Sequence, residues 1–163
     1  MAKRKKLNSM RLLESRAIPY ETRHYDPQIR DAEAVARAVG LPAREVFKTL
    51  VVERPAKKKP VLVLLPCNCS LNMKRLAKAL GDKKVALAPH ATAERLTGLQ
   101  VGGISPLALM QKRWDIFLDA RCADSTHIVI SAGQRGVQLR LETRALIDLL
   151  NCRIVDAADT KPE

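Results

Sequence analysis

The segment 46–52, with the sequence VFKTLVV, places a lysine inside what otherwise reads as a buried strand. Successive side chains of a strand point to opposite faces, so Lys48 shares one face with Val46, Leu50 and Val52. An unpaired ammonium group is costly to desolvate, so Lys48 must reach water at a sheet edge, pair with a carboxylate, or line a cleft where a ligand supplies the partner. For this segment alone, an ammonium group kept in water is the commoner arrangement. We pursue the cleft as the working hypothesis.

Composition predicts one basic globular domain. The chain has 163 residues, of which 47% are hydrophobic, 28% charged and only 3% aromatic, so the core is expected to consist of aliphatic side chains. Lys and Arg number 29 against 17 Asp and Glu, which gives a net charge of +12. Nucleic acid is therefore the first partner to consider. Anionic lipid is less favoured, because no cationic amphipathic helix with an aromatic flank is apparent.

No segment predicts membrane insertion or export. The longest aliphatic run, 61–65, is far too short to span a bilayer. The basic residues 3–6 resemble the start of a signal peptide, but the polar residues that follow supply no apolar segment. We therefore expect a cytoplasmic protein with no membrane partner, whose cysteines are reduced.

The cysteines and histidines do not form a metal-binding pattern. Only Cys67 and Cys69 are closely spaced, and a zinc site needs a second pair or nearby histidines. The remaining candidates stand at no ligand spacing to that pair: Cys122, Cys152, His24, His90 and His127. We predict no metal and no cofactor.

Periodicity and turn residues predict helices mixed irregularly with strands. Expected helices cover 9–17 with Asn8 or Ser9 as cap, 31–39 ending at Gly40, 70–80 from Ser70 to Gly81, 92–96 with Thr92 as cap and Gly98 as its end, and 143–150 with Thr143 as cap. Expected strands cover 20–25, 46–52, 61–65, 84–88, 115–119, 127–131, 137–141 and 153–155. This order favours a single α+β domain with a curved, mixed and largely antiparallel sheet and flanking helices. We expect a basic arm at 1–8, the domain at 9–157 and a tail at 158–163.

Two glycine-containing loops are candidates for chemistry. The loop 101–106 (VGGISP) has adjacent glycines that can direct backbone N–H groups at an oxyanion or phosphate, although a tight turn is the commoner reading. The loop 131–136 (SAGQRG) is a short hairpin with a hydroxyl and a guanidinium group. No phosphate-binding Gly-Lys-Ser/Thr loop, dinucleotide fingerprint or nucleophile motif is present.

Five segments, taken together and in this order, resemble the YbaK (YbaK/EbsC) family of aminoacyl-tRNA deacylases. They are 46–51, 76–85, the pair Thr97 and Gly98, 101–107 and 131–136. The family is related to the editing domain of bacterial prolyl-tRNA synthetase, and its members hydrolyse the ester of mischarged tRNA. The resemblance implies the same fold, aminoacylated tRNA as partner, and Cys-tRNA(Pro), with Cys-tRNA(Cys) as a further substrate. A prolyl-tRNA synthetase partner is expected on the same ground only.

The resemblance also implies a set of site residues. Lys48 corresponds to the essential lysine and is expected to hold the tRNA end or the aminoacyl group, while N–H groups around Gly102 and Gly103 face the carbonyl oxygen as it gains charge. No protein nucleophile is required, since the thiol of the substrate is thought to attack its own ester, and Cys67 and Cys69 are then structural or incidental. The expected substrate-binding residues are Tyr25, Thr49, Ile104, Ser105, Pro106, Ser131 and Arg135.

Several positions depart from the family pattern and leave alternatives open. The segment after Pro27 is shorter than usual, and Ala108, Ala132 and Gln134 replace residues more common in the family. These positions bear on the preferred amino acid and not on the reaction type, so a deacylase for another mischarged tRNA, such as Ala-tRNA(Pro), is an alternative. A non-catalytic module that binds tRNA or nucleotides is another, favoured by the net charge. The basic residues 3–6 are expected to add sequence-independent affinity for tRNA.

Overall fold

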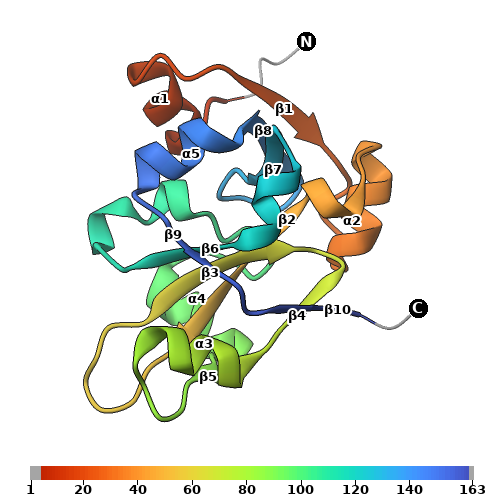
Figure 1. The fold of residues 1–163 in the computed structure, drawn as a ribbon. Helices are drawn as coiled ribbons and strands as arrows, with labels where there is room; N and C mark the ends of the chain where they lie inside the picture. Colours follow the sequence, from red (N-terminus) through yellow and green to blue (C-terminus); the bar gives the residue numbers. More distant parts are fainter. Residues whose placement is uncertain (1–4, 162–163) are drawn as a thin grey trace.

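The hairpin of β2 (Phe47–Glu53) and β3 (Val61–Pro66) lies at the centre of the fold (Figure 1). The computed structural model describes residues 5–161. In its largest sheet the strand order is β5-β2-β3-β6-β9, with β5 (Ala86–Leu87), β6 (Ile116–Asp119) and β9 (Arg153–Val155). The β5, β2 and β3 strands are antiparallel, whereas β6 and β9 run parallel to β3. The sheet is therefore mixed.

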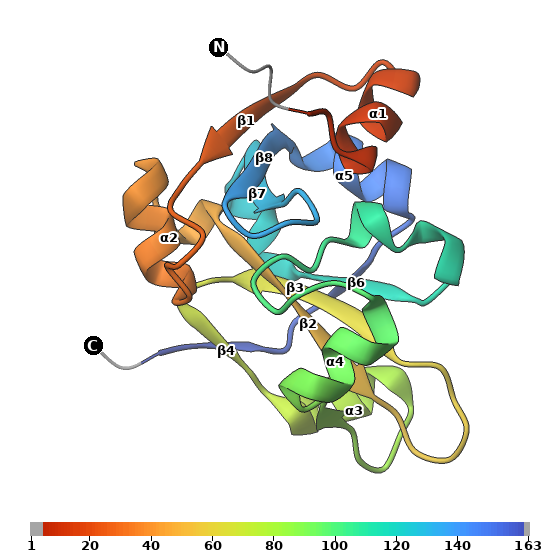
Figure 2. The same ribbon diagram turned by 180° about the vertical axis from the view of Figure 1, so that it is seen from behind.

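Both faces of β3 are covered, which explains its continuous apolar sequence. Val61 and Val63 pack in one cluster with α3 (Met73–Leu80), while Leu62 and Leu64 pack in the main core, to which α4 (His90–Thr97) contributes. The two helices lie on opposite faces of the sheet, as the front and rear views show (Figures 1 and 2).

A second, antiparallel sheet has the order β1-β8-β7 and shares the main core. Its strands are β1 (Tyr20–His24), β7 (His127–Ser131) and β8 (Val137–Glu142). The helices α1 (Asn8–Ser15) and α5 (Thr143–Leu150) bring the fully buried Leu13 and Leu146 to this core. A parallel bridge between Val46 and Val129 joins this sheet to the start of β2.

Short elements complete the described chain. The helix α2 (Ala32–Val39) follows β1, and β4 (Cys69–Leu71) pairs with β10 (Ala158–Thr160) in a small antiparallel sheet. Four 3-10 turns lie at Ala43–Glu45, Pro106–Ala108, Met110–Lys112 and Ala120–Asp124.

The predicted α+β class with a mixed sheet is confirmed, and so are three helix ends. Gly40, Gly81 and Gly98 each follow a helix in the left-handed conformation that favours glycine. The alternation of side chains along β2 is also as predicted. Phe47 and Val51 face the main core, whereas Val46 and Val52 pack in other clusters.

The start of the third helix is wrong in the prediction. The helix α3 begins at Met73, because the side chain of Asn72 accepts a hydrogen bond from the N–H of Arg75 at 3.0 Å. Ser70, its predicted start, lies in β4 and pairs with Asp159 of β10. The ordered structure therefore continues past residue 157, and residues 158–160 of the expected tail form a strand.

Three predicted caps are also wrong, because their hydroxyl groups serve tertiary contacts or stand inside a helix. Ser9 is buried within α1, which begins one residue earlier, and donates to the carbonyl of Ala132 at 2.6 Å. Thr143 stands in the first turn of α5 and donates to the carbonyl of Ser125 at 2.7 Å. Thr92 lies inside α4, which begins at His90. The strand expected at 84–88 shortens to Ala86–Leu87.

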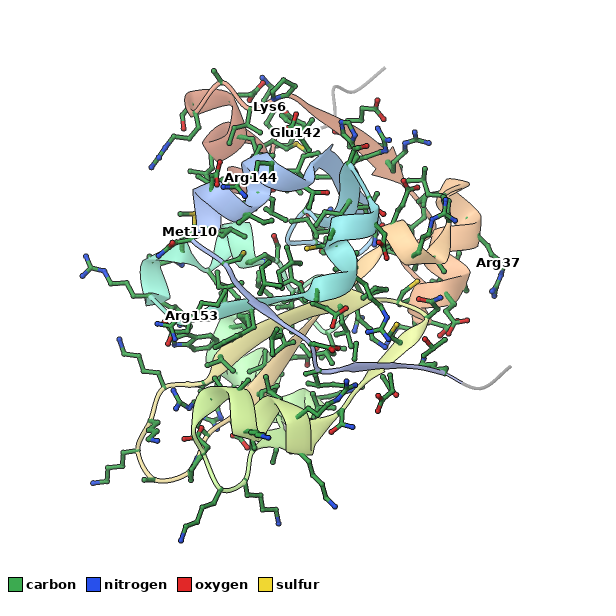
Figure 3. All side chains as sticks on the ribbon, viewed as in Figure 1. Lys6, Arg37, Met110, Glu142, Arg144 and Arg153 are labelled. Atoms are coloured by element: carbon green, nitrogen blue, oxygen red, sulfur yellow. The ribbon has the colours of Figure 1, made fainter. Side chains whose placement is uncertain are left out.

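The positive charge is spread over the molecule. Lys6, in the predicted arm, pairs with Glu14 at 2.6 Å, while residues 3 and 4 of the arm lie outside the described residues. Arg37 points away from α2, and Arg144 and Arg153 lie on other elements well apart from it (Figure 3). Among residues 5–161, no helix has the length and apolar character needed to cross a bilayer.

A buried carboxylate anchors the basic connection between β2 and β3. The Asp82 side chain is fully buried and accepts hydrogen bonds from Arg54 Nε at 2.6 Å, Arg54 Nη2 at 3.0 Å and Lys58 Nζ at 2.7 Å. The Arg54 and Lys58 hydrogen bonds lower the pKa of Asp82 from its ordinary 3.8 to about 2. The anionic form is therefore favoured by folding.

We predict that Asp82→Asn lowers the free energy of unfolding at pH 7 by roughly 1–3 kcal/mol, because two cations lose their charged partner. The folded-state pKa lies below the unfolded one, so this stabilisation is present above pH 4 and is lost as the pH falls toward 2. Urea unfolding at several pH values measures both effects. Asp148→Asn, which alters an exposed pair with Arg144, should change stability by less than about 0.5 kcal/mol. A difference in unfolding free energy between the wild type and Asp82→Asn that does not vary with pH would contradict the prediction.

Candidate functional site

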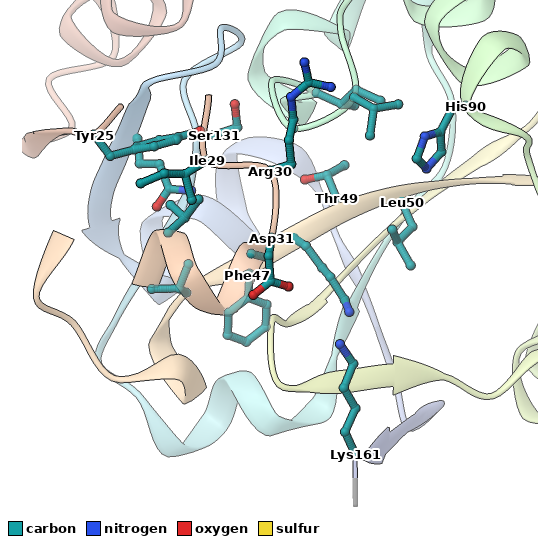
Figure 4. Close-up of a pocket in the computed structure, with 18 residues that line it drawn as sticks. Tyr25, Ile29, Arg30, Asp31, Phe47, Thr49, Leu50, His90, Ser131 and Lys161 are labelled. Carbon is teal, nitrogen blue, oxygen red and sulfur yellow. The ribbon is translucent and has the colours of Figure 1, made fainter. Parts of the chain in front are cut away.

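A pocket of about 280 Å³ opens beside β2, at a gap in the pairing of that strand (Figure 4). On the side away from β3, β2 is bridged to β7 at Val46 and pairs with β5 at Val52 and Glu53. Between these contacts the described strands leave residues 48–50 unpaired on that side. All three residues are partly buried and line the pocket.

Lys48 has no carboxylate partner within hydrogen-bonding distance among residues 5–161. Its pKa is lowered from the ordinary 10.5, first by burial and then by the positive charge of Lys161. A carboxylate pair would have raised this pKa. The carboxylate pair is therefore excluded among the described residues, and Lys48 lines a cleft; that a ligand supplies its partner stays a hypothesis.

Two residues of the pocket lining carry buried polar atoms without hydrogen-bond partners within residues 5–161. Thr49 Oγ1 and Gln138 Oε1 are both buried and have no hydrogen-bond partner among the described residues, and both residues line the pocket. Gln138 stands opposite Ser131 in the β7–β8 pairing. Buried polar atoms normally have partners, so this wall is suited to a polar ligand.

The loop 101–104 closes another side of the pocket and is held at Val101. The Val101 N–H donates to Glu94 Oε2 at 2.8 Å, and its carbonyl accepts from Arg135 Nε at 2.7 Å. Gly103 packs so closely on the 134–135 backbone that a Cβ there would lie 2.8 Å from Arg135 N. Only glycine allows this approach without a backbone shift.

The structure brings six of the predicted site residues to the pocket wall. They are Tyr25, Lys48, Thr49, Gly102, Ile104 and Ser131. Gly102 has φ +92°, and the hydrogen bonds of the described residues do not use its N–H. By contrast, the N–H of Gly103 donates to the carbonyl of Gln100 at 2.8 Å. Within this loop the N–H of Gly102 thus takes no part in the hydrogen bonds of the described residues, whereas that of Gly103 does.

Four predicted site residues lie outside the pocket lining. Gly103 and Pro106 are buried, and Ser105 is fully buried with its Oγ accepting from the N–H of Leu107 at 3.2 Å. Arg135 holds Val101 from behind. These residues shape the loop that carries Gly102 and do not face the cavity.

Sequence reasoning missed several residues of the lining, namely Arg30, Asp31, His90, Gln138 and Lys161. Gln138 could have been found, because a hairpin over 127–141 sets it opposite Ser131. Asp31 was expected only at a helix start, where its side chain does accept from the N–H of Ala34 at 3.0 Å. No sequence pattern indicated Lys161, since it lay in the expected tail.

The cysteines are unsuited to act as nucleophiles. All four are free thiols and none lines the pocket. Burial raises the pKa of Cys67 to about 11 and that of Cys152 to about 12, and it also raises the pKa of Cys69 and Cys122. These thiols are therefore protonated at neutral pH. Residues 5–161 contain no group of three or more His, Cys, Asp or Glu side chains placed to hold a metal ion.

Comparison with known proteins identifies the family. A family described as the aminoacyl-tRNA editing domain matches residues 26–149. EbsC of Enterococcus faecalis, named "Putative Cys-tRNA(Pro)/Cys-tRNA(Cys) deacylase", is 36% identical, over 93% of this chain and 94% of its own. The proline–tRNA ligase of Pelotomaculum thermopropionicum is 27% identical over 78% of this chain, which spans only 24% of that ligase.

Solved structures share the fold. The hypothetical protein APE2540 superposes with a TM-score of 0.85 at 22% identity, over 94% of this chain and all of that one. A protein described as "a putative trans-editing enzyme for prolyl tRNA synthetase" superposes with a TM-score of 0.79 at 20% identity, over 96% of this chain and 99% of that one. The chain belongs to the aminoacyl-tRNA editing domain family, as the predicted resemblance indicated.

We predict that Arg135→Ala loosens the loop 101–104, because Val101 loses the hydrogen bond to its carbonyl. Backbone amides of residues 99–104 should exchange with solvent roughly tenfold faster, which corresponds to the loss of one charge-assisted hydrogen bond. Hydrogen exchange followed by mass spectrometry measures this. Arg140→Ala is the matched control, since Arg140 reaches Glu21 at 3.8 Å and does not touch the loop. Equal exchange in the two variants would show that Arg135 does not hold the loop.

Proposed function

We propose that this protein is a trans-editing deacylase that removes cysteine from mischarged tRNA, with Cys-tRNA(Pro) as its substrate and Cys-tRNA(Cys) as a second one. The observation that carries the proposal is the likeness to EbsC, which extends over nearly the whole of both chains at 36% identity. The pocket adds independent support, because it combines a lysine without a carboxylate partner with unpartnered polar atoms.

The pocket suits the end of an aminoacylated tRNA. Its volume of about 280 Å³ lies just below the usual range for ligand sites, which fits an aminoacyl group and not the body of a tRNA. Thr49 and Gln138 line the pocket, and we propose that their buried oxygens, which have no partners among the described residues, accept hydrogen bonds from the α-amino group or the terminal ribose. Lys48 then holds the 3′ end of the tRNA next to the ester as a point charge.

The side chains of the pocket favour a mechanism without a protein nucleophile. Ser131 Oγ accepts from the N–H of Gly133 at 3.2 Å, and no hydrogen bond among the described residues joins it to a histidine or carboxylate. A serine nucleophile requires such a base. In the proposed reaction the cysteinyl thiol of the substrate attacks its own ester carbonyl, so a C–S bond forms and the bond to the ribose oxygen breaks.

The proton balance of this step is simple. The thiol proton passes to the departing ribose oxygen, which leaves tRNA with a free hydroxyl group and releases a cyclic thioester that water later opens. In this proposal the N–H of Gly102, which lines the pocket, stabilises the carbonyl oxygen as it gains negative charge. Lys48 and the wall around Thr49, Ser131 and Gln138 fix the substrate in the reactive geometry.

We further propose that a second protein supplies the choice of tRNA, with prolyl-tRNA synthetase as the partner. The support is the small size of the pocket, which in this proposal takes only the aminoacyl end of the tRNA. Because the 3′ end has the same sequence in every tRNA, contacts in the pocket cannot distinguish one tRNA from another. Adding prolyl-tRNA synthetase should increase the rate on Cys-tRNA(Pro) relative to Cys-tRNA(Cys). An unchanged ratio would refute the partnership and leave the deacylation proposal intact.

We predict that the protein releases cysteine from Cys-tRNA(Pro) and that Lys48→Ala reduces kcat/KM by about 100-fold or more, because the ester end is no longer positioned. The measurement follows ester loss from cysteinyl, alanyl and prolyl tRNA(Pro). Lys59→Ala removes the same charge from the exposed β2–β3 connection and should change the rate less than threefold. Faster release of alanine than of cysteine would identify Ala-tRNA(Pro) as the substrate in place of Cys-tRNA(Pro). Binding of these tRNAs without release of any amino acid would refute the enzymatic proposal.

We also predict that S-methylation of the cysteinyl thiol slows release by about 100-fold or more, because the attacking group is lost while the size of the amino acid changes little. Seryl-tRNA(Pro), with a weaker nucleophile at the same position, should also be cleaved slowly. If the methylated substrate is cleaved at the rate of the native one, an activated water is the nucleophile and the substrate-assisted step is excluded.

A further inference from the structure

The C-terminal segment brings a second lysine to the pocket. Lys161 follows β10, and Figure 4 shows its side chain directed from that segment toward the residues on β2. It lines the same cavity as Lys48. Its positive charge contributes to the lowered pKa of Lys48, so the two ammonium groups are close enough to repel one another.

The segment that carries Lys161 is firmly attached. The carbonyl of Ala158 accepts from Arg75 Nη2 at 2.9 Å and from Arg121 Nη1 at 2.8 Å, and Arg75 also pairs with Asp159 at 2.5 Å. The N–H of Lys161 donates to the carbonyl of Asn68 at 3.2 Å. These contacts fix Lys161 directly after β10 and beside the start of β4, where it forms part of the pocket wall.

The charges around the cavity are unbalanced. Arg30, Lys48 and Lys161 line it, and Asp31 is the one carboxylate among the described lining residues. One oxygen of Asp31 is occupied at the start of α2. Lys161 reaches Glu33 at 3.4 Å, but both side chains are about 40% exposed, so this pair is weak. An anion between Lys48 and Lys161 would relieve their repulsion.

We propose that Lys161 and Lys48 together form a phosphate-binding site at the pocket entrance, which holds a phosphodiester group of the tRNA 3′ end. This inference rests on the proposed function, because it names how the same pocket takes its substrate. Two ammonium groups that line one cavity can both contact the oxygens of a single anionic backbone phosphate, while the adjoining polar wall takes the aminoacyl end. Lys161 is thus a binding residue, and β10 belongs to the substrate site.

The test measures binding of the trinucleotide CCA, the 3′ end of every tRNA, over a range of salt concentrations. Lys161→Ala should weaken binding about fivefold at low salt and reduce the slope of log affinity against log salt, because one phosphate contact is lost. Lys161→Arg should restore binding to within about twofold of the wild type. Lys57→Ala, which removes an exposed lysine from the β2–β3 connection, should leave binding unchanged.

Glu33→Gln separates ligand binding from a structural role of the Lys161–Glu33 pair. If Lys161 binds phosphate, this variant should bind CCA as tightly as the wild type or more tightly, since Lys161 is released from its partner. The proposal would be overturned if Glu33→Gln weakened CCA binding as much as Lys161→Ala does. It would also be overturned if Lys161→Ala bound CCA with the affinity of the wild type. CCA binding requires no catalysis, so it can depend on Lys161 even if the protein does not deacylate tRNA. Failure of the phosphate-binding proposal can therefore be distinguished from failure of the deacylation proposal.

Discussion

The site depends on the interrupted pairing of one strand. On the side away from β3, β2 contacts β7 at its beginning and β5 at its end, and the residues between them face a cavity. A strand paired continuously on both sides would have no room there for a ligand. The gap allows a lysine to occupy an otherwise apolar strand, because its ammonium group opens into the cavity and not into the core.

The surrounding structure fixes the walls of that gap. The loop 101–104 is held at both polar groups of Val101, by Glu94 on α4 and by Arg135 on the β7–β8 hairpin. The hairpin also supplies Ser131 and Gln138 to the opposite wall. One hairpin thus supports the loop with a guanidinium group and lines the cavity with residues that carry a hydroxyl and an amide. Such shared support preorganises a site without a catalytic triad.

Much of the fold could be predicted from the sequence, because its signals are local. Glycines at 40, 81 and 98 mark helix ends, and the alternation in β2 places Lys48 on the correct face. The pairing of β4 with β10 could not be predicted. Each strand has three residues, too few for a periodic pattern, and they lie more than 80 positions apart. Lys161 was missed as a site residue because it directly follows β10, whose pairing with β4 was not predicted.

The candidate site could be predicted in part, since motif order identifies loops but not the direction of each side chain. Gly102 and Ser131 do reach the cavity, whereas Gly103, Ser105 and Arg135 support the loop from behind. Adjacent residues in a loop commonly divide in this way, because one lines the ligand site while the next packs underneath. Three-dimensional contacts were needed to separate the two groups.

The central claim, that the cavity beside β2 holds the aminoacyl end of tRNA, is tested most directly with an uncleavable ligand. Adenosine that carries cysteine through an amide in place of the ester can be titrated into the labelled protein and followed by nuclear magnetic resonance. We predict that the shifted backbone signals cluster at Thr49, Gly102, Ser131 and Gln138. Shifts confined to the separate hollow between residues 5–10 and 134–137, or no shifts at all, would contradict the account.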